Sequence, residues 1–249
     1  MAIDPQRAND PLGRAMYDYH RGVDGTLHYR DGTRTRDGNV EGFYFQPRSK
    51  WADQTIERLE RLATHGDPVL DVGCGSGQHV RWFEDRRCVT TGIDVDRWAV
   101  ATARARGADD VLVGDMFDLP FEYGQFRSLQ CVGTQLGLGG SLEGISALLE
   151  EFARVTDDRA LAVVDNYDPR GLDESFLGYR SDPRDGVAHR CFHFEYRPVG
   201  DDSQLVGPTL HFLLCSPDRL REATIGTPWT LVETLEREAH YVACLEKGA

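Results

Sequence analysis

Short hydrophobic runs alternate with longer amphipathic segments from residue 66 to the end of the chain. Runs rich in β-branched residues and bounded by Gly, Asp or Asn are typical of strands, whereas apolar residues three and four positions apart are typical of helices. The predicted strands are Pro68–Gly73, Cys88–Asp94, Asp110–Val113, Arg127–Val132 and Ala160–Asn166. Because helical segments separate these runs, the pattern predicts βαβ units and a largely parallel sheet, the α/β class.

The clearest helical pattern covers Ser141–Val155, where Leu, Ile, Phe and Val recur at helical spacing. The alternation of strand-like and helix-like segments stops after Asn166. The runs "VAHRCFHFEYRPV" and "PTLHFLLCS" alternate with a period of two, and they predict an antiparallel strand pair at about residues 187–215 inserted into the sheet domain. A helix over Pro217–Ile225 and strands over Trp229–Leu235 and His240–Glu246 complete the chain.

Residues 1–64 lie before this alternating pattern and have to be interpreted separately. The stretch "GRAMYDYHRG" suggests a short helix, and two Asp-Gly pairs, at Asp31 and Asp37, favour tight turns. The stretch "SKWADQTIERLERLATHG" reads as a helix that leads into the first strand. We therefore expect an N-terminal lid-like segment with a lead-in helix over residues 1–64, followed by the sheet domain over residues 65–249.

The composition indicates one domain, or one domain with an appendage, since the chain has 249 residues of which 40% are hydrophobic. No charge-free apolar run approaches the roughly 18 residues that span a bilayer, and the N-terminus lacks the apolar segment of a signal peptide. We expect a cytoplasmic protein with no membrane partner. The six cysteines form no CxxC pair and are expected to be reduced core residues: Cys74, Cys88, Cys131, Cys191, Cys215 and Cys244.

The net charge of -13 argues against a nucleic-acid backbone as partner, because phosphate binding needs clustered Lys and Arg. Lys50 and Lys247 are the only lysines in the sequence. An acidic, lysine-poor composition resembles that of proteins from salt-adapted, halophilic cytosols, where the charge reports the habitat rather than the partner. Net charge alone therefore decides little about function.

The stretch "VLDVGCGSGQHV" places glycines at every second position, Gly73, Gly75 and Gly77, directly after the first predicted strand. A glycine-rich turn between a strand and a helix lets the backbone approach a nucleotide closely. Dinucleotide-binding loops need a third glycine where Gln78 stands. Asp71, two residues before the first glycine, suits a cationic amino group better than a pyrophosphate. The loop therefore predicts an adenosine ligand that carries a positive charge.

Two further acids follow the next two predicted strands. Asp94 ends the second strand, where its carboxylate can accept hydrogen bonds from both ribose hydroxyls. Asp115 follows the third strand and can accept from an adenine amino group, while Met116 offers a backbone N–H and an apolar side chain to the ring. Three acids at three consecutive strand ends predict one ligand site.

The motifs "VLDVGCGSGQHV", "GIDVD" and "GDMFDLPF" resemble the first three sequence motifs of class I S-adenosylmethionine-dependent methyltransferases. The resemblance is strong over residues 66–166, and "WTLVETLEREAHYVACLEK" is similar to the last two strands of that family. It implies a Rossmann-like, seven-stranded, mostly parallel sheet whose last strand is antiparallel, with helices on both faces. It also implies S-adenosyl-L-methionine as cofactor. By position, Asp71, Gly73, Gly75 and Gly77 would line the methionine, Asp94 the ribose, and Asp115 with Met116 the adenine.

The acceptor of the methyl group is less defined. The fourth predicted strand ends in "LQCVGTQLGLGG", which lacks the Asn-Pro-Pro-Tyr-like tetrad expected for methylation of DNA bases or of protein glutamine. Asp165 and Asn166 occupy the place of magnesium ligands in catechol-type enzymes, but the further acid of that set is absent, so no metal is expected. Asp165 and Asn166 would then shape the loop or touch the substrate.

No catalytic residue stands out. His193 and Glu195 could act as a base, or they could belong to a partly exposed strand face, and Tyr19, His20 and Tyr44 could belong to a lid over the cofactor. We expect a small-molecule methyltransferase acting on N, O or C, whose pocket is formed by the segment before Trp51 and by residues 167–206. The alternatives are an RNA or protein methyltransferase and a non-catalytic cofactor-binding protein. A homodimer through the hairpin at residues 189–215 also stays open.

Overall fold

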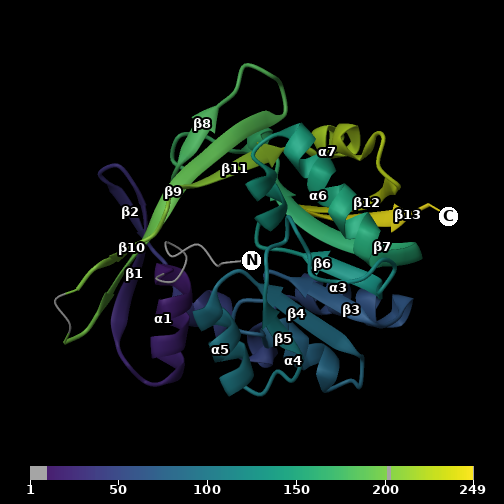
Figure 1. Ribbon diagram of the computed structural model, residues 1–249. Helices are drawn as coiled ribbons and strands as arrows, with labels where there is room; N and C mark the ends of the chain where they lie inside the picture. The colour runs from purple at the N-terminus through teal and green to yellow at the C-terminus, as the bar shows by residue number, and fades with distance from the viewer. Residues whose placement is uncertain (1–9, 201–202, 249) are drawn as a thin grey trace.

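The computed structural model describes residues 10–200 and 203–248 and contains two β-sheets (Figure 1). The larger sheet has seven strands in the order β12-β13-β7-β6-β3-β4-β5. These strands are β3 (Val69–Val72), β4 (Thr90–Asp94), β5 (Val111–Val113), β6 (Phe126–Cys131), β7 (Thr156–Tyr167), β12 (Trp229–Arg237) and β13 (His240–Lys247). Each predicted strand of the sheet domain is thus present.

Strand direction also agrees with the prediction. Strands β5, β4, β3, β6 and β7 pair in parallel, whereas β13 pairs antiparallel with both β7 and β12. The predicted Rossmann-like sheet with an antiparallel last strand is therefore confirmed. β7 begins at Thr156, four residues before its predicted start at Ala160, because residues 157–159 are polar and partly exposed and give no hydrophobic signal.

Helices cover both faces of this sheet, as expected. The apolar residues Leu59 and Leu62 of α3 (Asp53–His65) pack with Trp82 and Phe83 of α4 (Gln78–Glu84) against one face. Helices α6 (Leu142–Val155) and α7 (Pro217–Thr224) belong to the largest core cluster, together with Leu70 of β3. Helix α5 (Arg97–Ala105) forms a smaller cluster with α4 and β5 near the sheet edge.

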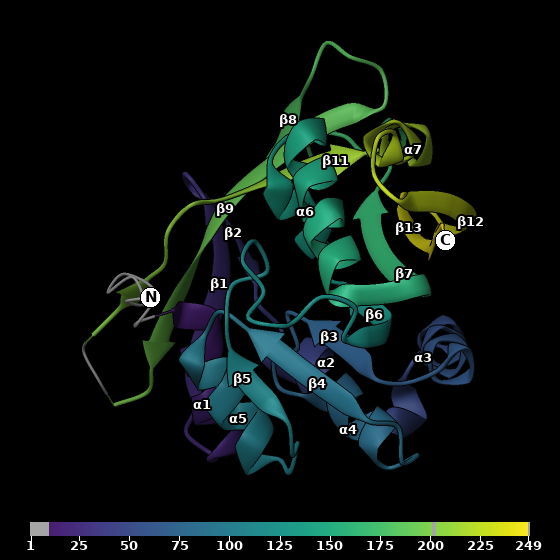
Figure 2. The same cartoon turned by 45° about the vertical axis from the view of Figure 1, so that its right-hand side comes forward.

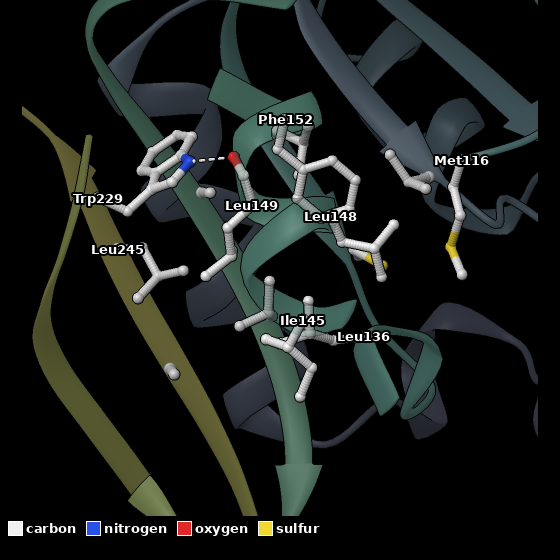
Figure 3. Close-up of a cluster of buried hydrophobic side chains, with 14 of the residues drawn as sticks. Met116, Leu136, Ile145, Leu148, Leu149, Phe152, Trp229 and Leu245 are labelled. Atoms are coloured by element: carbon white, nitrogen blue, oxygen red, sulfur yellow. Dashed lines mark hydrogen bonds between the residues drawn. The ribbon is translucent and has the colours of Figure 1, made fainter. Parts of the chain in front are cut away.

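The core around α6 explains why its sequence pattern was so clear. Ile145, Leu148, Leu149 and Phe152 are almost completely buried and line one side of the helix (Figure 3). Trp229 at the start of β12 packs beside them and donates its Nε1–H to the carbonyl oxygen of Leu149 at 2.7 Å. The Ser141 side chain caps the helix by accepting from Gly144 N–H.

The second sheet has six strands built on one long strand, β9 (Val187–Pro198). The first half of β9 pairs with β8 (Tyr179–Ser181) and β11 (Leu210–Cys215), which confirms the predicted antiparallel pair. Its second half pairs with β10 (Leu205–Val206) and with β1 (Gly25–Asp31), and β1 in turn pairs with β2 (Arg34–Asp37). The N-terminal segment and the insertion thus form one sheet (Figures 1 and 2), a pairing that the sequence did not predict.

Two short helices of the N-terminal segment flank this second sheet. Helix α1 (Pro11–His20) begins at an Asp10 side-chain cap and lies beside α5, where Tyr17 contacts Trp98 with ring centroids 4.8 Å apart (Figure 1). Helix α2 (Val40–Tyr44) follows β2 and is succeeded by a single 3-10 turn, η2 (Arg48–Lys50). These helices connect the second sheet to the seven-stranded one.

No helix within residues 10–200 and 203–248 is long and apolar enough to cross a membrane. All six cysteines are unpaired, as expected. Cys74, Cys131, Cys215 and Cys244 are buried, whereas Cys88 and Cys191 are only partly covered.

Candidate functional site

The glycine loop follows β3 and turns sharply into α4. Gly73, Gly75 and Gly77 have φ angles of 72°, 54° and 73°, in the left-handed region that residues with a Cβ rarely adopt. A Cβ at Gly77 would also lie 2.7 Å from the Cβ of Ala103, so this glycine lets α4 and α5 pack closely. Gly73 and Gly75 line a cavity, whereas Gly77 faces α5.

That cavity has a volume of about 850 Å³ and lies between the carboxyl ends of the central strands and the second sheet. In α/β sheets this edge is where ligands bind. Its walls come from the glycine loop, from the loop after β6, from the ends of β7 and β13, from α3, and from the segments around β2, α2 and β9. The lining residues used below are Arg36, Asp37, Tyr44, Arg58, Gly73, Gly75, His79, Gly133, Thr134, Asp165, Tyr167, Phe176, Arg190 and His240.

Asp71, the acid of the first motif, lies buried in β3 beneath the glycine loop. Its Oδ1 accepts a hydrogen bond from Gln130 Nε2 at 2.8 Å, but its Oδ2 is buried and has no partner within the described residues. Burial raises the pKa of Asp71 to about 7, although the hydrogen bond from Gln130 and the charge of Arg58 oppose this. A buried acceptor without a donor is the feature that a cationic group of a ligand would satisfy.

Asp94 holds the glycine loop at the end of β4. Its Oδ2 accepts from Gly75 N–H and its Oδ1 from Asp96 N–H, both at 2.9 Å. The Val95 N–H also interacts with this carboxylate. A carboxylate has about four acceptor positions, so Asp94 can still accept from a hydroxyl group. Burial raises the pKa of Asp94 to about 6 and that of Asp96 to about 8, and nearby Asp10 raises both further.

Asp115 and Met116 lie farther along the same edge, outside the lining of the cavity. The Oδ1 of Asp115 accepts from Phe117 N–H at 3.1 Å within the turn after β5. Met116 is 9% exposed and belongs to the largest core cluster, at its margin in Figure 3. Asp71 and Asp94 are also outside the lining, but Asp94 bonds Gly75 of the loop and Asp71 lies in the strand that leads into it. The structure therefore brings Asp71, Gly73, Gly75 and Asp94 together, and the methionine, ribose and adenine assignments all stay predictions.

The N-terminal segment covers the glycine loop. Ser76 Oγ donates to the carbonyl oxygen of Tyr44, and Arg106 donates to the same oxygen at 2.9 Å. A Cβ at Gly75 would contact the Tyr44 ring at 3.6 Å and Met16 Sδ at 3.9 Å. Tyr44 therefore lies on the loop, as a lid residue would. Tyr19 and His20 are exposed at the far end of α1 and do not line the cavity.

The ends of β6 and β7 meet at Asp165. Its two oxygens accept from Gly133 N–H at 2.9 Å and from Thr134 N–H at 2.6 Å, which holds Thr134 at a φ of 64°. Asp165 thus shapes this loop, as one of the sequence interpretations proposed. Asn166 instead points into the core, where its Nδ2 donates to the carbonyl oxygen of Leu213 at 3.2 Å. No group of three or more metal-ligating side chains occurs within residues 10–200 and 203–248.

His240 is a site residue that the sequence analysis missed. Because β13 is antiparallel, its first residue lies beside the carboxyl end of β7, opposite Tyr167. The Nε2 of His240 lies 3.1 Å from Asp165 Oδ2, and the ring meets the Tyr167 ring edge-on at 5.1 Å between centroids. Since the carboxylate accepts the Nε2 hydrogen, Nδ1 keeps a lone pair that can accept a proton.

Arg58 and His79 form a second pair that sequence reasoning missed. Arg58 Nη2 lies 3.5 Å from His79 Nε2, and Arg58 Nε is buried without a partner in the described part of the chain. Burial lowers the pKa of His79 to about 3, and the charge of Arg58 lowers it further, so the ring is neutral. The guanidinium is therefore a partly buried cation in the cavity wall, with no carboxylate bonded to it among those residues.

His193 and Glu195, considered above as possible bases, lie on the other face of β9 and do not line the cavity. They contact each other at 3.2 Å, and Glu195 forms an ion pair with Arg30 at 2.7 Å. Their neighbours Phe192, Phe194 and Tyr196 share the buried face, as the alternation predicted. His193 and Glu195 therefore belong to a partly exposed strand face, the second of the two interpretations given above.

The residues at the glycine loop fit S-adenosylmethionine. The unpartnered Asp71 oxygen suits its ammonium group, the unpaired Arg58 suits its carboxylate, and the remaining acceptor capacity of Asp94 suits a ribose hydroxyl. The loop itself, with two glycines facing the cavity, leaves room for close approach.

Comparisons with known proteins identify similar chains. Residues 69–159 match the family described as "Methyltransferase domain". A 165-residue stretch is 30% identical to dTDP-3-amino-3,6-dideoxy-alpha-D-glucopyranose N,N-dimethyltransferase from Streptomyces fradiae, and it covers 65% of this chain and 62% of that relative. The match thus spans about three fifths of the relative's length.

Solved structures share the fold. A methyltransferase from Bacteroides fragilis in complex with S-adenosyl-L-homocysteine is 18% identical, with a TM-score of 0.77 over 100% of this chain and 98% of its own. The sugar N-methyltransferase KedS8 from Streptoalloteichus sp ATCC 53650 is 15% identical, with a TM-score of 0.63 over 88% and 99% of the two chains. Residues 69–159 therefore match a methyltransferase domain, and the chain has the fold of S-adenosylmethionine-dependent methyltransferases.

Proposed function

We propose that this protein transfers a methyl group from S-adenosylmethionine to a nitrogen of a small-molecule amine. The observation that carries the proposal is that one cavity of about 850 Å³ is lined both by the glycine loop and by the His240–Asp165 pair. The N,N-dimethyltransferase relative acts on an amino sugar, which supports an amine acceptor.

The residues of the cavity have distinct roles in this proposal. Bound S-adenosylmethionine supplies a methyl carbon on a sulfonium, and its transfer to nitrogen breaks the C–S bond, leaves the electron pair on sulfur and leaves a surplus proton on the nitrogen. Asp71, Arg58 and Asp94 hold the cofactor's charged and hydroxyl groups. The N-terminal segment, through Tyr44, keeps water from the loop.

His240 is the proton acceptor in this scheme. Its Nδ1 carries the lone pair, and the hydrogen bond from Nε2 to Asp165 fixes the ring and stabilises the imidazolium that forms. Asp165 is itself fixed by Gly133 and Thr134. The antiparallel last strand thus contributes a base to the end of the sheet at which ligands bind.

The test is a methyl-transfer assay with labelled S-adenosylmethionine and a panel of free and nucleotide-linked amino sugars, with bulk RNA and protein as other acceptors. We expect label in amines only. In His240→Gln the rate falls by about 10²- to 10⁴-fold and the acidic limb of the pH–rate profile is lost, because glutamine cannot take up a proton. His211→Gln is the matched control, since His211 lies on β11 outside the cavity and should leave the rate unchanged.

Other outcomes identify the alternatives. Label in RNA or protein but in no amine would replace the small-molecule acceptor with a macromolecular one. Binding of S-adenosylmethionine without label in any acceptor would favour a non-catalytic binding protein. An unchanged pH profile in His240→Gln would remove His240 as the base.

A further inference from the structure

The wall of the cavity formed by the second sheet contains two arginines that have no acidic partner among the described residues. Arg190 projects from β9 and Arg36 from β2, and both line the cavity. Two other arginines of the same sheet pair with acids, Arg30 with Glu195 at 2.7 Å and Arg180 with Asp31 at 2.8 Å. Arg34 and Arg197 instead donate to carbonyl or amide oxygens and do not line the cavity. In a chain of net charge -13, two neighbouring cations without such a partner need an explanation.

Arg190 is held in place by its own sheet. Its Nε donates to the carbonyl oxygen of Leu177 at 3.1 Å. Its guanidinium lies 4.4 Å from the ring centroid of Phe176 and 4.6 Å from that of Phe192. Stacking fixes the plane of the group, and only the Nε–H has a hydrogen-bond acceptor in the described part of the chain. The remaining N–H donors suit a planar or tetrahedral oxyanion.

The electrostatic surroundings of Arg190 also favour an anion. Burial lowers the pKa of Arg190, and the positive charge of Arg36 lowers it further, while Tyr29 and Tyr167 act in the opposite direction. Two acids line the cavity, and both accept backbone hydrogen bonds: Asp37 from Asn39 N–H at 2.5 Å, and Asp165 from the loop after β6. Neither forms an ion pair with Arg190 or Arg36.

We propose that Arg190 and Arg36 bind an anionic group of the methyl acceptor, a phosphate or a carboxylate. This inference rests on the proposed function and specifies its substrate class as an amine that also carries a negative charge. Arg58 lies near the glycine loop and interacts electrostatically with Asp71 and Asp165, whereas Arg190 interacts with Arg36, Tyr29 and Tyr167. The cavity therefore has separate cations for the cofactor's carboxylate and for the acceptor's anion.

The experiment measures anion binding by calorimetry at fixed ionic strength, using protein saturated with S-adenosylhomocysteine so that Arg58 is already occupied. The probes are inorganic pyrophosphate, thymidine diphosphate and citrate, which separate phosphate from carboxylate. We expect at least one probe to bind the wild-type protein, with affinity at least 10-fold weaker in Arg190→Gln and also weakened in Arg36→Gln. The control Arg197→Gln removes an exposed arginine of the same strand that bonds Gln204, and it should bind like the wild type.

Failure of the inference differs from failure of the proposed function. If no probe binds the wild-type protein, or if both variants bind as tightly as Arg197→Gln, the arginines do not hold an anion. Since Arg36 is exposed, its variant should fold even where Arg190→Gln does not. Anion binding that depends on these arginines, without methyl transfer to any amine, would leave the anion site standing and overturn the proposed reaction.

Discussion

Replacing Asp71 with asparagine should stabilise the cofactor-free protein at high pH while weakening cofactor binding. Asp71 is 1% exposed and carries one unpartnered oxygen, and burial raises its pKa to about 7 from an ordinary value of 3.8. The unfolded chain releases this proton above 3.8, whereas the folded chain keeps it until about 7. Because the folded state binds more protons in that window, stability falls as the pH rises through it.

The magnitude follows from the pH window. Each pH unit between the two pKa values costs about 1.4 kcal/mol, so the ionisation of Asp71 should cost the wild-type protein about 2.5 kcal/mol between pH 5 and pH 8. Asparagine does not titrate and therefore avoids this loss. Its amide can still accept from Gln130, and any cost of burying its NH₂ group is the same at both pH values. The quantity to measure is therefore how the difference in unfolding free energy between Asp71→Asn and the wild type changes from pH 5 to pH 8.

Urea unfolding of both proteins at pH 5 and pH 8, after removal of bound cofactor, measures this change. We expect the stability of Asp71→Asn relative to the wild type to rise by about 2.5 kcal/mol from pH 5 to pH 8. We also expect weaker binding of S-adenosylmethionine, since the charge opposite its ammonium group is gone. The reasoning is refuted if the stability difference is the same at both pH values.

Three further expectations follow from the same region and from the composition. Asp94→Asn should weaken S-adenosylmethionine binding by about 1.5 to 3 kcal/mol in calorimetry without unfolding the protein, and unchanged affinity would place the ribose elsewhere. Gly77→Ala should lower the unfolding free energy by about 2 to 4 kcal/mol. Gly140→Ala is the control, because Gly140 has a similar φ but nothing within 4 Å of an added Cβ, and it should cost only about 1 to 2 kcal/mol. Equal losses in the two variants would contradict the packing argument. If the lysine-poor surface is a salt adaptation, the melting temperature should rise from dilute buffer to molar KCl, and equal temperatures would remove the halophilic interpretation.

The parts of the fold that local patterning determines could be predicted from the sequence. Strands β3, β4 and β7 contain hydrophobic runs that end at Gly or acidic residues, and α6 shows helical spacing over its whole length. Asp71 and Asp94 could be identified as a pair because the ends of neighbouring parallel strands meet at one edge of the sheet. These features depend on residues within about 20 positions of one another.

The second sheet could be predicted only in part, because its pairing joins distant segments. The β9–β11 pair follows from alternation on both sides of one turn. β1 pairs with the other half of β9, about 170 residues away, and β2 is exposed along its whole length, so neither has a hydrophobic pattern that identifies its partner. The sequence analysis expected the pocket wall to come from the segment before Trp51 and from residues 167–206, and both segments line the cavity. The sequence did not reveal the strand pairing that places Arg36 and Arg190 in the same wall.

The polar residues missed in the cavity share a physical reason for being missed. His240 contributes to the site only because β13 is antiparallel, which brings the first residue of the last strand beside the end of β7. Arg58 looks like an ordinary charged position of an amphipathic helix, and only its buried, unpartnered Nε shows otherwise. Direction and burial are properties of the folded chain, so residue type alone did not distinguish these two from surface residues.

The charge distribution of the cavity contrasts with that of the chain. Two acids of the site, Asp94 and Asp165, hold backbone N–H groups of two loops. Asp71 accepts from Gln130 through one oxygen, and its other oxygen has no partner among the described residues. Arg58 and Arg190 instead keep donors that no carboxylate of the described residues satisfies. Apart from the second oxygen of Asp71, negative charge at this site therefore shapes the loops, whereas the arginine donors remain available for ligands. The arginines inside the cavity would attract an anionic acceptor, whereas the net negative charge of the protein would repel it.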